Sequence, residues 1–153
     1  MTFRVTVLGS SSAMPTLKRN PSAHALNVHE QFFLIDCGEG TQVTMKMLGW
    51  GFKAIDVICF THFHADHISG LPGLLLTIGN AGRTEPLTLI GPVGLQRIVE
   101  GLTLIAPELP FPIEYIELTQ DAPNPISVGA FEIHHCPADH MVKCFAYRID
   151  LKR

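Results

Sequence analysis

No stretch of this sequence is apolar for long enough to cross a membrane as a helix. The longest apolar run, residues 74–78, is interrupted at Thr77, whereas a spanning helix needs about 20 apolar residues. Internal repeats, low-complexity tracts and linkers are also missing from the 153 residues. The length therefore predicts one domain with a core of its own and without a membrane anchor.

Closely spaced cysteine pairs are a second absence. The four cysteines are Cys37, Cys59, Cys136 and Cys144, and no two of them form a CxxC pair. The first residues run directly into a strand-like pattern, so no signal peptide is indicated. This usage of cysteine predicts reduced thiols and a cytoplasmic location.

Excess positive charge is the third absence. Charged residues make up 16% of the chain, and the formal net charge is −3. A protein that grips nucleic acid over its whole surface carries an excess of basic residues. Any contact with RNA must therefore be local, or must be carried by metal ions and by parts of the molecule outside this chain.

The apolar residues, 46% of the chain, follow patterns typical of strands. Alternating patterns predict strands at residues 3–7, 24–28, 113–118 and 145–151, and a hairpin of residues 126–128 and 131–135 around Gly129. Continuous apolar runs predict further strands at 32–35, 57–60 and 87–90. The run at 32–35 is expected to be covered on both faces.

Three segments between the predicted strands have helical patterns. Thr41 is expected to cap a helix that extends to about residue 48. Residues 71–79 form a second helix, with Pro72 tolerated in its first turn. Helical spacing of five apolar residues predicts an amphipathic helix over residues 95–105. Strands interspersed with helices predict an α/β (α+β) fold in which helices pack outside a mixed sheet.

Chemistry is concentrated directly after the predicted strand 57–60, where the sequence reads H-x-H-x-D-H. Residues two apart in an extended segment point the same way, so His62 and His64 can reach one metal ion. Asp66 and His67 lie where the chain turns toward the next helix, where they can hold a second ion. Gly70 is expected to permit a tight turn there.

A lone histidine is usually an ordinary core residue, but this cluster is different. Three imidazoles and a carboxylate within six residues would leave several buried polar groups unsatisfied without a metal, at about 1–3 kcal/mol each. Imidazole and carboxylate are ligands that suit zinc. His140, in a loop after a strand, is a candidate third ligand for the ion of His62 and His64, whereas His134 and His135 are expected to be structural or surface residues.

The segment THFHADHISGLPGLLL, residues 61–76, resembles ribonuclease Z, a tRNA 3′-end endonuclease of the metallo-β-lactamase superfamily. The polar loop of residues 15–20, which contains Lys18, Arg19 and Asn20, is similar to the substrate loop of that family, and residues 33–42 are similar to its second strand and turn. The Asp139-His140 pair followed by residues 146–149 is similar to its third metal segment. The resemblance covers essentially the whole chain.

The resemblance implies an αββα sandwich and a site with two zinc ions that share a bridging water. It implies that His62, His64 and His140 bind one ion, that Asp66 and His67 bind the other, and that Asp66 accepts the proton of the water. Lys18, Arg19 and Asn20 are then expected to contact precursor tRNA. A homodimer is also implied, in which a protruding arm of one subunit serves the site of the other.

The resemblance also implies that the family's chains are about twice as long as this one. Residues 1–153 are therefore expected to be the N-terminal half of the metallo-β-lactamase-fold domain, ending before the arm that binds tRNA. The family's bridging aspartate, its last zinc-binding histidine and a histidine that assists the leaving group have no clear match here. Asp150 lies in a strand pattern and is not assigned as the bridge.

Three functions remain open from the sequence. The first is the tRNA endonuclease. The second is another hydrolase of the same fold, acting on a thioester, a lactone or a different phosphodiester, because one fold supports many chemistries. The third is a metal-binding fragment without activity of its own. The loop at Arg19 and the GLPGLL segment that begins at Gly70 favour the nuclease.

Overall fold

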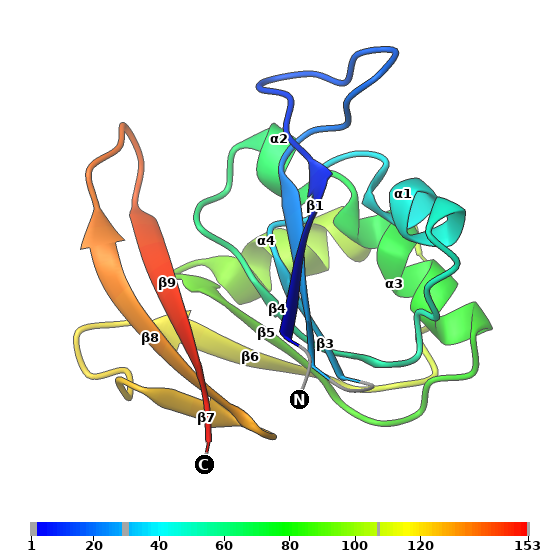
Figure 1. Ribbon diagram of the computed structural model, residues 1–153. Helices are drawn as coiled ribbons and strands as arrows, with labels where there is room; N and C mark the ends of the chain where they lie inside the picture. The colour runs from blue at the N-terminus through cyan, green and yellow to red at the C-terminus, as the bar shows by residue number, and fades with distance from the viewer. Residues whose placement is uncertain (1–2, 29–30, 107, 153) are drawn as a thin grey trace.

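The computed structural model describes residues 3–28, 31–106 and 108–152. Within them the chain forms two sheets and a set of short helices (Figure 1). The strands are β1 (Phe3–Gly9), β2 (Ala23–Val28), β3 (Gln31–Ile35), β4 (Ile55–Cys59), β5 (Leu87–Pro92), β6 (Ile113–Leu118), β7 (Ile126–Val128), β8 (Phe131–Ala138) and β9 (Cys144–Leu151). The helices are α1 (Thr41–Met47), α2 (Ala65–Ile68), α3 (Leu71–Asn80) and α4 (Leu95–Thr103).

The larger sheet follows chain order, β1-β2-β3-β4-β5-β6. Its first two pairings are antiparallel, and the pairings from β3 to β6 are parallel. Parallel neighbours need a crossover connection, and helices supply it between β3 and β4, β4 and β5, and β5 and β6. The carboxyl ends of β3, β4 and β5 therefore lie at one edge of the sheet, where sites of open α/β sheets are commonly built.

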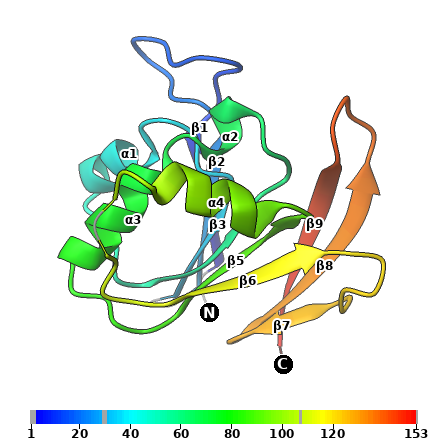
Figure 2. The ribbon, with the colours of Figure 1, turned by 180° about the vertical axis from the view of Figure 1, so that it is seen from behind.

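Two apolar layers cover the larger sheet. The helices pack on one face, and the antiparallel sheet β7-β8-β9 lies against the other (Figures 1 and 2). Alternate residues of β3 divide between the layers, since Leu34 is buried under the helices and Phe33 packs edge-on against Phe131 of the second sheet at 5.7 Å. Both faces of β3 are thus covered, as its continuous apolar run predicts.

This helix–sheet–sheet arrangement confirms the predicted α/β class with a mixed sheet and outer helices. The described residues form no second helical layer beyond β7-β8-β9. None of the helices in the described ranges has the length and apolar character of a membrane span.

Three local expectations are wrong. Thr41 does not cap α1: the N-cap is Gly40 in the left-handed region (φ 82°), and the Thr41 hydroxyl donates instead to the carbonyl of Gly38 at 2.7 Å. Helix α4 ends at Thr103, and Ile105, expected on its apolar face, is 89% exposed. Strand β8 continues to Ala138 rather than ending at residue 135, because its pairing with β9 extends that far.

Gly70 is required for a reason other than the one predicted. Its backbone is right-handed helical (φ −78°), which any residue can adopt. A Cβ at this position would lie 2.1 Å from the carbonyl oxygen of Gly38. Glycine therefore permits the close approach of the turns that follow β3 and β4, and this approach brings their side chains together.

Candidate metal centre

The carboxyl end of β4 leads directly into the histidine motif. His62 and His64 lie in the extended segment after this strand, and helix α2 carries Asp66 and His67. His140 comes from the other sheet, on the turn between β8 and β9. The backbone N–H of Phe145 donates to the carbonyl of Thr61 at 2.9 Å and holds this hairpin against the motif.

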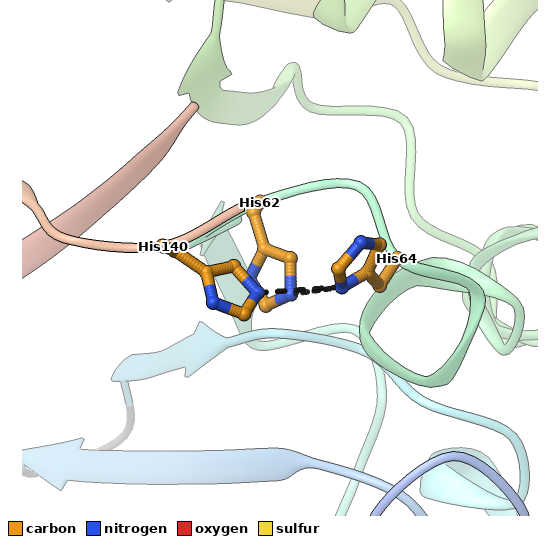
Figure 3. Close-up of side chains that lie close together, drawn as sticks. All are labelled: His62, His64 and His140. Atoms are coloured by element: carbon orange, nitrogen blue, oxygen red, sulfur yellow. Dashed lines mark hydrogen bonds between the residues drawn. The ribbon is translucent and has the colours of Figure 1, made fainter. Parts of the chain in front are cut away.

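His62, His64 and His140 point toward one another (Figure 3). His62 Nε2 lies 3.1 Å from His64 Nδ1, and His140 Nε2 lies 3.4 Å from the same atom. One nitrogen from each of the three rings falls within 4.8 Å of the others. Tetrahedral ligation of zinc by imidazole, at about 2.0–2.1 Å, needs nitrogens about this far apart.

Asp66 and His67 lie beside this cluster. The rings of His62 and His67 are 4.0 Å apart between centroids. His67 Nε2 lies 3.7 Å from Asp66 Oδ2, so one carboxylate oxygen and one ring nitrogen can face a common point. The structure thus brings together all five residues that the sequence indicates as metal ligands.

Asp36 connects the two groups of ligands from behind. Its Oδ2 accepts from His67 Nδ1 at 2.7 Å, which leaves Nε2 of that ring facing Asp66. The hydroxyl of Thr61 lies 3.0 Å from the same carboxylate oxygen and 2.9 Å from His62 Nδ1. If Thr61 donates to Asp36 and accepts from His62 Nδ1–H, then His62 Nε2 carries the lone pair that faces the cluster.

The electrostatics of the cluster favour neutral His62 and ionised Asp66. Burial, together with the neighbouring His67, lowers the pKa of His62 to about 4. Burial opposes ionisation of Asp66, but the backbone N–H of Ala13 and the charge of His67 outweigh it and lower the pKa of Asp66. Metal ligands must be unprotonated, so both shifts favour metal binding at neutral pH.

His67 behaves differently. Burial opposes its protonation, but the hydrogen bond and charge of Asp36, with the charge of Asp66, outweigh burial and raise the pKa of His67. A proton therefore competes more strongly for His67 than for His62. Asp36 supplies the carboxylate that metal-ligating histidines commonly contact through their other nitrogen.

The donor set fits zinc. Three imidazole nitrogens face one point, and the carboxylate of Asp66 and the imidazole of His67 lie next to it. Asp36 and Thr61 contact the Nδ1 atoms of His67 and His62 and so orient these two rings. His62, His64 and His140 would hold one ion with three protein ligands. Asp66 and His67 would offer two ligands to a second ion.

The predicted substrate residues lie on a loop outside the cluster. Lys18 and Arg19 line an open pocket of about 460 Å³ against α1, with Val43 and Met47 on its other side. The side-chain amide of Asn20 donates to Thr44 Oγ1 of α1 at 2.8 Å. The loop still reaches the candidate metal centre, because the N–H of one of its residues, Ala13, donates to Asp66 Oδ2 at 2.9 Å.

His134 and His135 lie on β8, away from the cluster. His134 contacts Asp150 Oδ2 at 3.1 Å, and His135 Nε2 lies 3.1 Å from the carbonyl of Pro123. Asp150 is occupied on β9 by this contact and by Arg148 at 2.8 Å. These contacts agree with structural or surface roles for the two histidines.

Sequence reasoning missed Asp36, Thr61 and Ala13. The available signal for Asp36 was an acidic residue directly after a buried strand, followed by Cys37-Gly38. Asp36 adopts a left-handed conformation (φ 61°) and is 2% exposed. A strained, buried carboxylate at the end of a strand is a common mark of a functional site.

A helix–sheet–sheet fold with an H-x-H-x-D-H cluster at the carboxyl ends of its parallel strands defines a metallo-β-lactamase-fold protein. Crystal structures of this class share the fold: that of human tRNase Z, short form (ELAC1), is 29% identical with a TM-score of 0.84, over 98% of this chain and 65% of that one. The metallo-β-lactamase fold protein YhfI from Bacillus subtilis is 23% identical, with a TM-score of 0.77 over 97% of this chain and 58% of that one.

Residues 3–99 match the protein-family model described as "Anti-Pycsar protein Apyc1", so the chain belongs to this family. The chain is also 54% identical over 149 residues to ribonuclease Z of Clostridium kluyveri, covering 97% of this chain and 49% of that protein. Ribonuclease Z of Agathobacter rectalis is 52% identical, with the same coverage. The predicted resemblance to ribonuclease Z is thus confirmed, and the chain spans about half the length of these curated relatives.

Proposed function

We propose that this chain provides most of the metal centre of a zinc-dependent phosphodiesterase that removes the 3′ trailer from precursor tRNA. The observation that carries the proposal is the convergence of His62, His64 and His140 beside Asp66 and His67. The sequence identity of 54% and 52% to two ribonuclease Z relatives supports precursor tRNA as the substrate. The homodimer implied by the resemblance and the cytoplasmic location predicted from the cysteines are part of the same proposal.

The residues of the chain would divide the work as follows. His62, His64 and His140 would hold one zinc ion and Asp66 and His67 a second, and the ions would supply a lowered pKa of the attacking water and neutralisation of charge on the phosphate. Asp66 would accept a proton at a carboxylate oxygen from the water that attacks the phosphorus. As the new P–O bond forms, the bond between phosphorus and the 3′ oxygen of the tRNA breaks, and that oxygen leaves and takes up a proton from solvent. Asp36 keeps His67 oriented directly and His62 oriented through Thr61. Lys18 and Arg19 contact the phosphates of the RNA, for which Arg19 offers a bidentate fork. Asn20 supports them from the same loop, since its side-chain amide already donates to Gly40 and Thr44.

The test is cleavage of a precursor tRNA labelled in its 3′ trailer. Because the chain spans half of its relatives, the assay combines it with the remaining half of the Clostridium kluyveri protein. We expect zinc-dependent release of the intact trailer, lost in Asp66→Ala and kept in Asp121→Asn, a control at an exposed aspartate that is not among the candidate ligands. A zinc-loaded mixture that leaves precursor tRNA uncut would overturn the proposal.

A second candidate is hydrolysis of a different phosphodiester by the same residues. The match of residues 3–99 to a family model named for another protein favours it. In the same assay this function would appear as zinc-dependent hydrolysis of a small phosphodiester, lost in Asp66→Ala, with precursor tRNA left intact.

A further inference from the structure

A loop of residues 10–20, here called the 10–20 loop, joins β1 to β2 and rises above α2 (Figure 1). Its two ends are held together, because the N–H of Ser11 donates to the carbonyl of Asn20 at 2.9 Å. Asn20 in turn fastens the loop to α1 through Thr44. The loop is therefore tied to the body of the protein at its base.

In the part of the chain that the structure describes, one hydrogen bond joins the 10–20 loop to the candidate metal centre. The N–H of Ala13 donates to Asp66 Oδ2 at 2.9 Å, across 53 residues of sequence. Ala13 makes this contact in a left-handed conformation (φ 63°), which residues other than glycine rarely adopt. Two hydrogen bonds close the turn around it, from Ser11 Oγ to the carbonyl of Met14 at 2.9 Å and from the N–H of Met14 to the carbonyl of Ser12 at 2.8 Å.

We infer that Ala13 is a positioning residue: its backbone N–H sets the orientation of the Asp66 carboxylate as a ligand of the second metal ion. Asp66 and His67 are the two candidate ligands of that ion, so a rotation of the carboxylate would remove half of its protein donors. Among the described residues, no hydrogen bond joins His62, His64 or His140 to the 10–20 loop. The two ions should therefore respond differently to changes at Ala13.

The inference also connects substrate binding with the metal centre. Lys18 and Arg19 are carried by the same loop, five and six residues after Ala13 along the chain. A phosphate that draws these side chains toward it would act on the segment that holds Asp66. This connection rests on the proposed function, whereas the orientation of Asp66 by Ala13 does not.

The test compares substitutions that differ in their tolerance of the left-handed conformation. Ala13→Gly keeps the N–H and adopts φ near +60° without strain. Ala13→Val keeps the N–H, but its β-branched side chain disfavours this conformation. Met14→Val is the matched control, because it places the same side chain at the next residue, which is 71% exposed and outside the left-handed region.

Zinc binding is measured by titration against a competing chelator. We expect Ala13→Val to lower the affinity for the second zinc ion by about tenfold or more, the usual effect of losing a contact that orients a ligand. The first ion should bind equally in all variants, and Ala13→Gly and Met14→Val should retain both affinities. Equal binding of the second ion by Ala13→Val and wild type would overturn the inference, whether or not precursor tRNA is cut.

A second measurement decides the matter if Ala13→Val does not fold or the second ion is too weak to titrate. The amide proton of Ala13 is followed by NMR in two metal-free proteins, the wild-type chain and the Asp66→Ala variant. We expect its resonance to move upfield and its exchange with solvent to accelerate when the carboxylate is removed. An unchanged Ala13 amide would show that the two residues do not interact in solution.

Discussion

Asp36 joins the two halves of the candidate metal centre at the scale of a single residue. Its carboxylate accepts from His67 Nδ1 at 2.7 Å and from the N–H of Thr61 at 2.8 Å. The Thr61 hydroxyl lies between this carboxylate and His62 Nδ1, and so connects Asp36 with the orientation of His62. Because Asp36 is buried in a left-handed conformation, the surrounding turns must hold it there. The residue contributes through the ligands it orients, since it is not itself among the candidate ligands.

Asp36→Asn should therefore weaken metal binding without removing a ligand. Asparagine has the same shape and tolerates the left-handed region, so the turn is expected to persist. An amide accepts a hydrogen bond from an imidazole less strongly than a carboxylate does, and we expect zinc affinity to fall by about 10–100-fold. Chelator competition measures the effect, with Asp121→Asn as the control; wild-type zinc affinity in Asp36→Asn would contradict the assigned role.

His62 should make the metal-free chain sensitive to acid. Its pKa is about 4 in the folded chain and 6.5 when unperturbed. Between these values the unfolded chain binds a proton that the folded chain does not, so the free energy of unfolding falls as pH is lowered through this window. Urea unfolding at about pH 7 and about pH 5, with chelator present, should show a smaller loss for His62→Gln than for wild type.

His67 provides a control of opposite sign. Its folded pKa is raised above 6.5, so its stabilising contribution is present below pH 6.5 and is lost as pH rises through the folded pKa. His67→Gln should abolish this loss on the alkaline side. It should narrow the acidic window of His62 without removing it, because burial, the largest cause of the lowered His62 pKa, remains after the charge of His67 is lost. Identical unfolding curves for both variants across the two windows would contradict the assignment of the shifts.

At the scale of elements, regular patterns were predicted well and their ends poorly. Alternation and continuous apolar runs located the strands because burial on one or both faces leaves a direct periodic trace. The end of α4 was misplaced because Ile105 continues the helical spacing, although the chain has already left the helix. The cap at Thr41 failed because Gly40 in the left-handed region and a carbonyl contact of Thr41 replace it.

The candidate site was predictable where its residues are contiguous. His62, His64, Asp66 and His67 follow one strand, so their convergence can be inferred from spacing. His140 was only a candidate from its place in a loop after a strand, and the resemblance supported it, because no local pattern reveals that a turn of the second sheet reaches the first. Ala13 acts through its backbone N–H, and a backbone donor carries no signature in its side chain.

The RNA contact proposed for Arg19 can be tested separately from catalysis at the metal centre. Arg19 lines an open pocket against α1 rather than the histidine cluster. Arg19→Ala, in the combined assay with the missing half, should weaken cleavage of precursor tRNA more than hydrolysis of a small phosphodiester. The salt dependence of RNA binding should decrease by about one unit of slope if one phosphate contact is lost. Lys53→Ala, an exposed cation elsewhere, serves as the control, and equal losses on both substrates would argue against RNA positioning.

At the scale of the whole molecule, the larger sheet has an uncovered part. The second sheet covers Leu26 and Val28 of β2, but the residues opposite them on β1 point to the same face without cover. Val5 is 60% exposed, Val7 58% and Phe3 44%. Such a row of exposed apolar side chains is unusual on the sheet face that packs against the second sheet. An open cleft of about 860 Å³ separates Phe3 from the end of β9. The half of the ribonuclease Z relatives that this chain does not span is the expected occupant of this face.

We therefore predict that the isolated 153-residue chain cuts precursor tRNA poorly or not at all, and that the missing half of a relative restores cleavage in trans. Asp66 and His67 alone should hold the second ion loosely, whereas two-metal catalysis needs a fixed separation of about 3.5–4 Å. The net charge of −3 also offers little grip on RNA. Binding of the missing half and trailer release are measured together.

Val5→Asp is the variant that tests the docking face, because Val5 is exposed and its replacement should leave the fold of the isolated chain intact. It should reduce both association and trailer release, since a buried unpaired carboxylate would be costly in the assembled protein. Arg4→Asp changes the neighbouring residue, which points to the opposite face of β1, and should leave both unchanged. Robust cleavage by the chain alone, abolished by Asp66→Ala, would show that the second half is dispensable and that the uncovered row on β1 has another explanation.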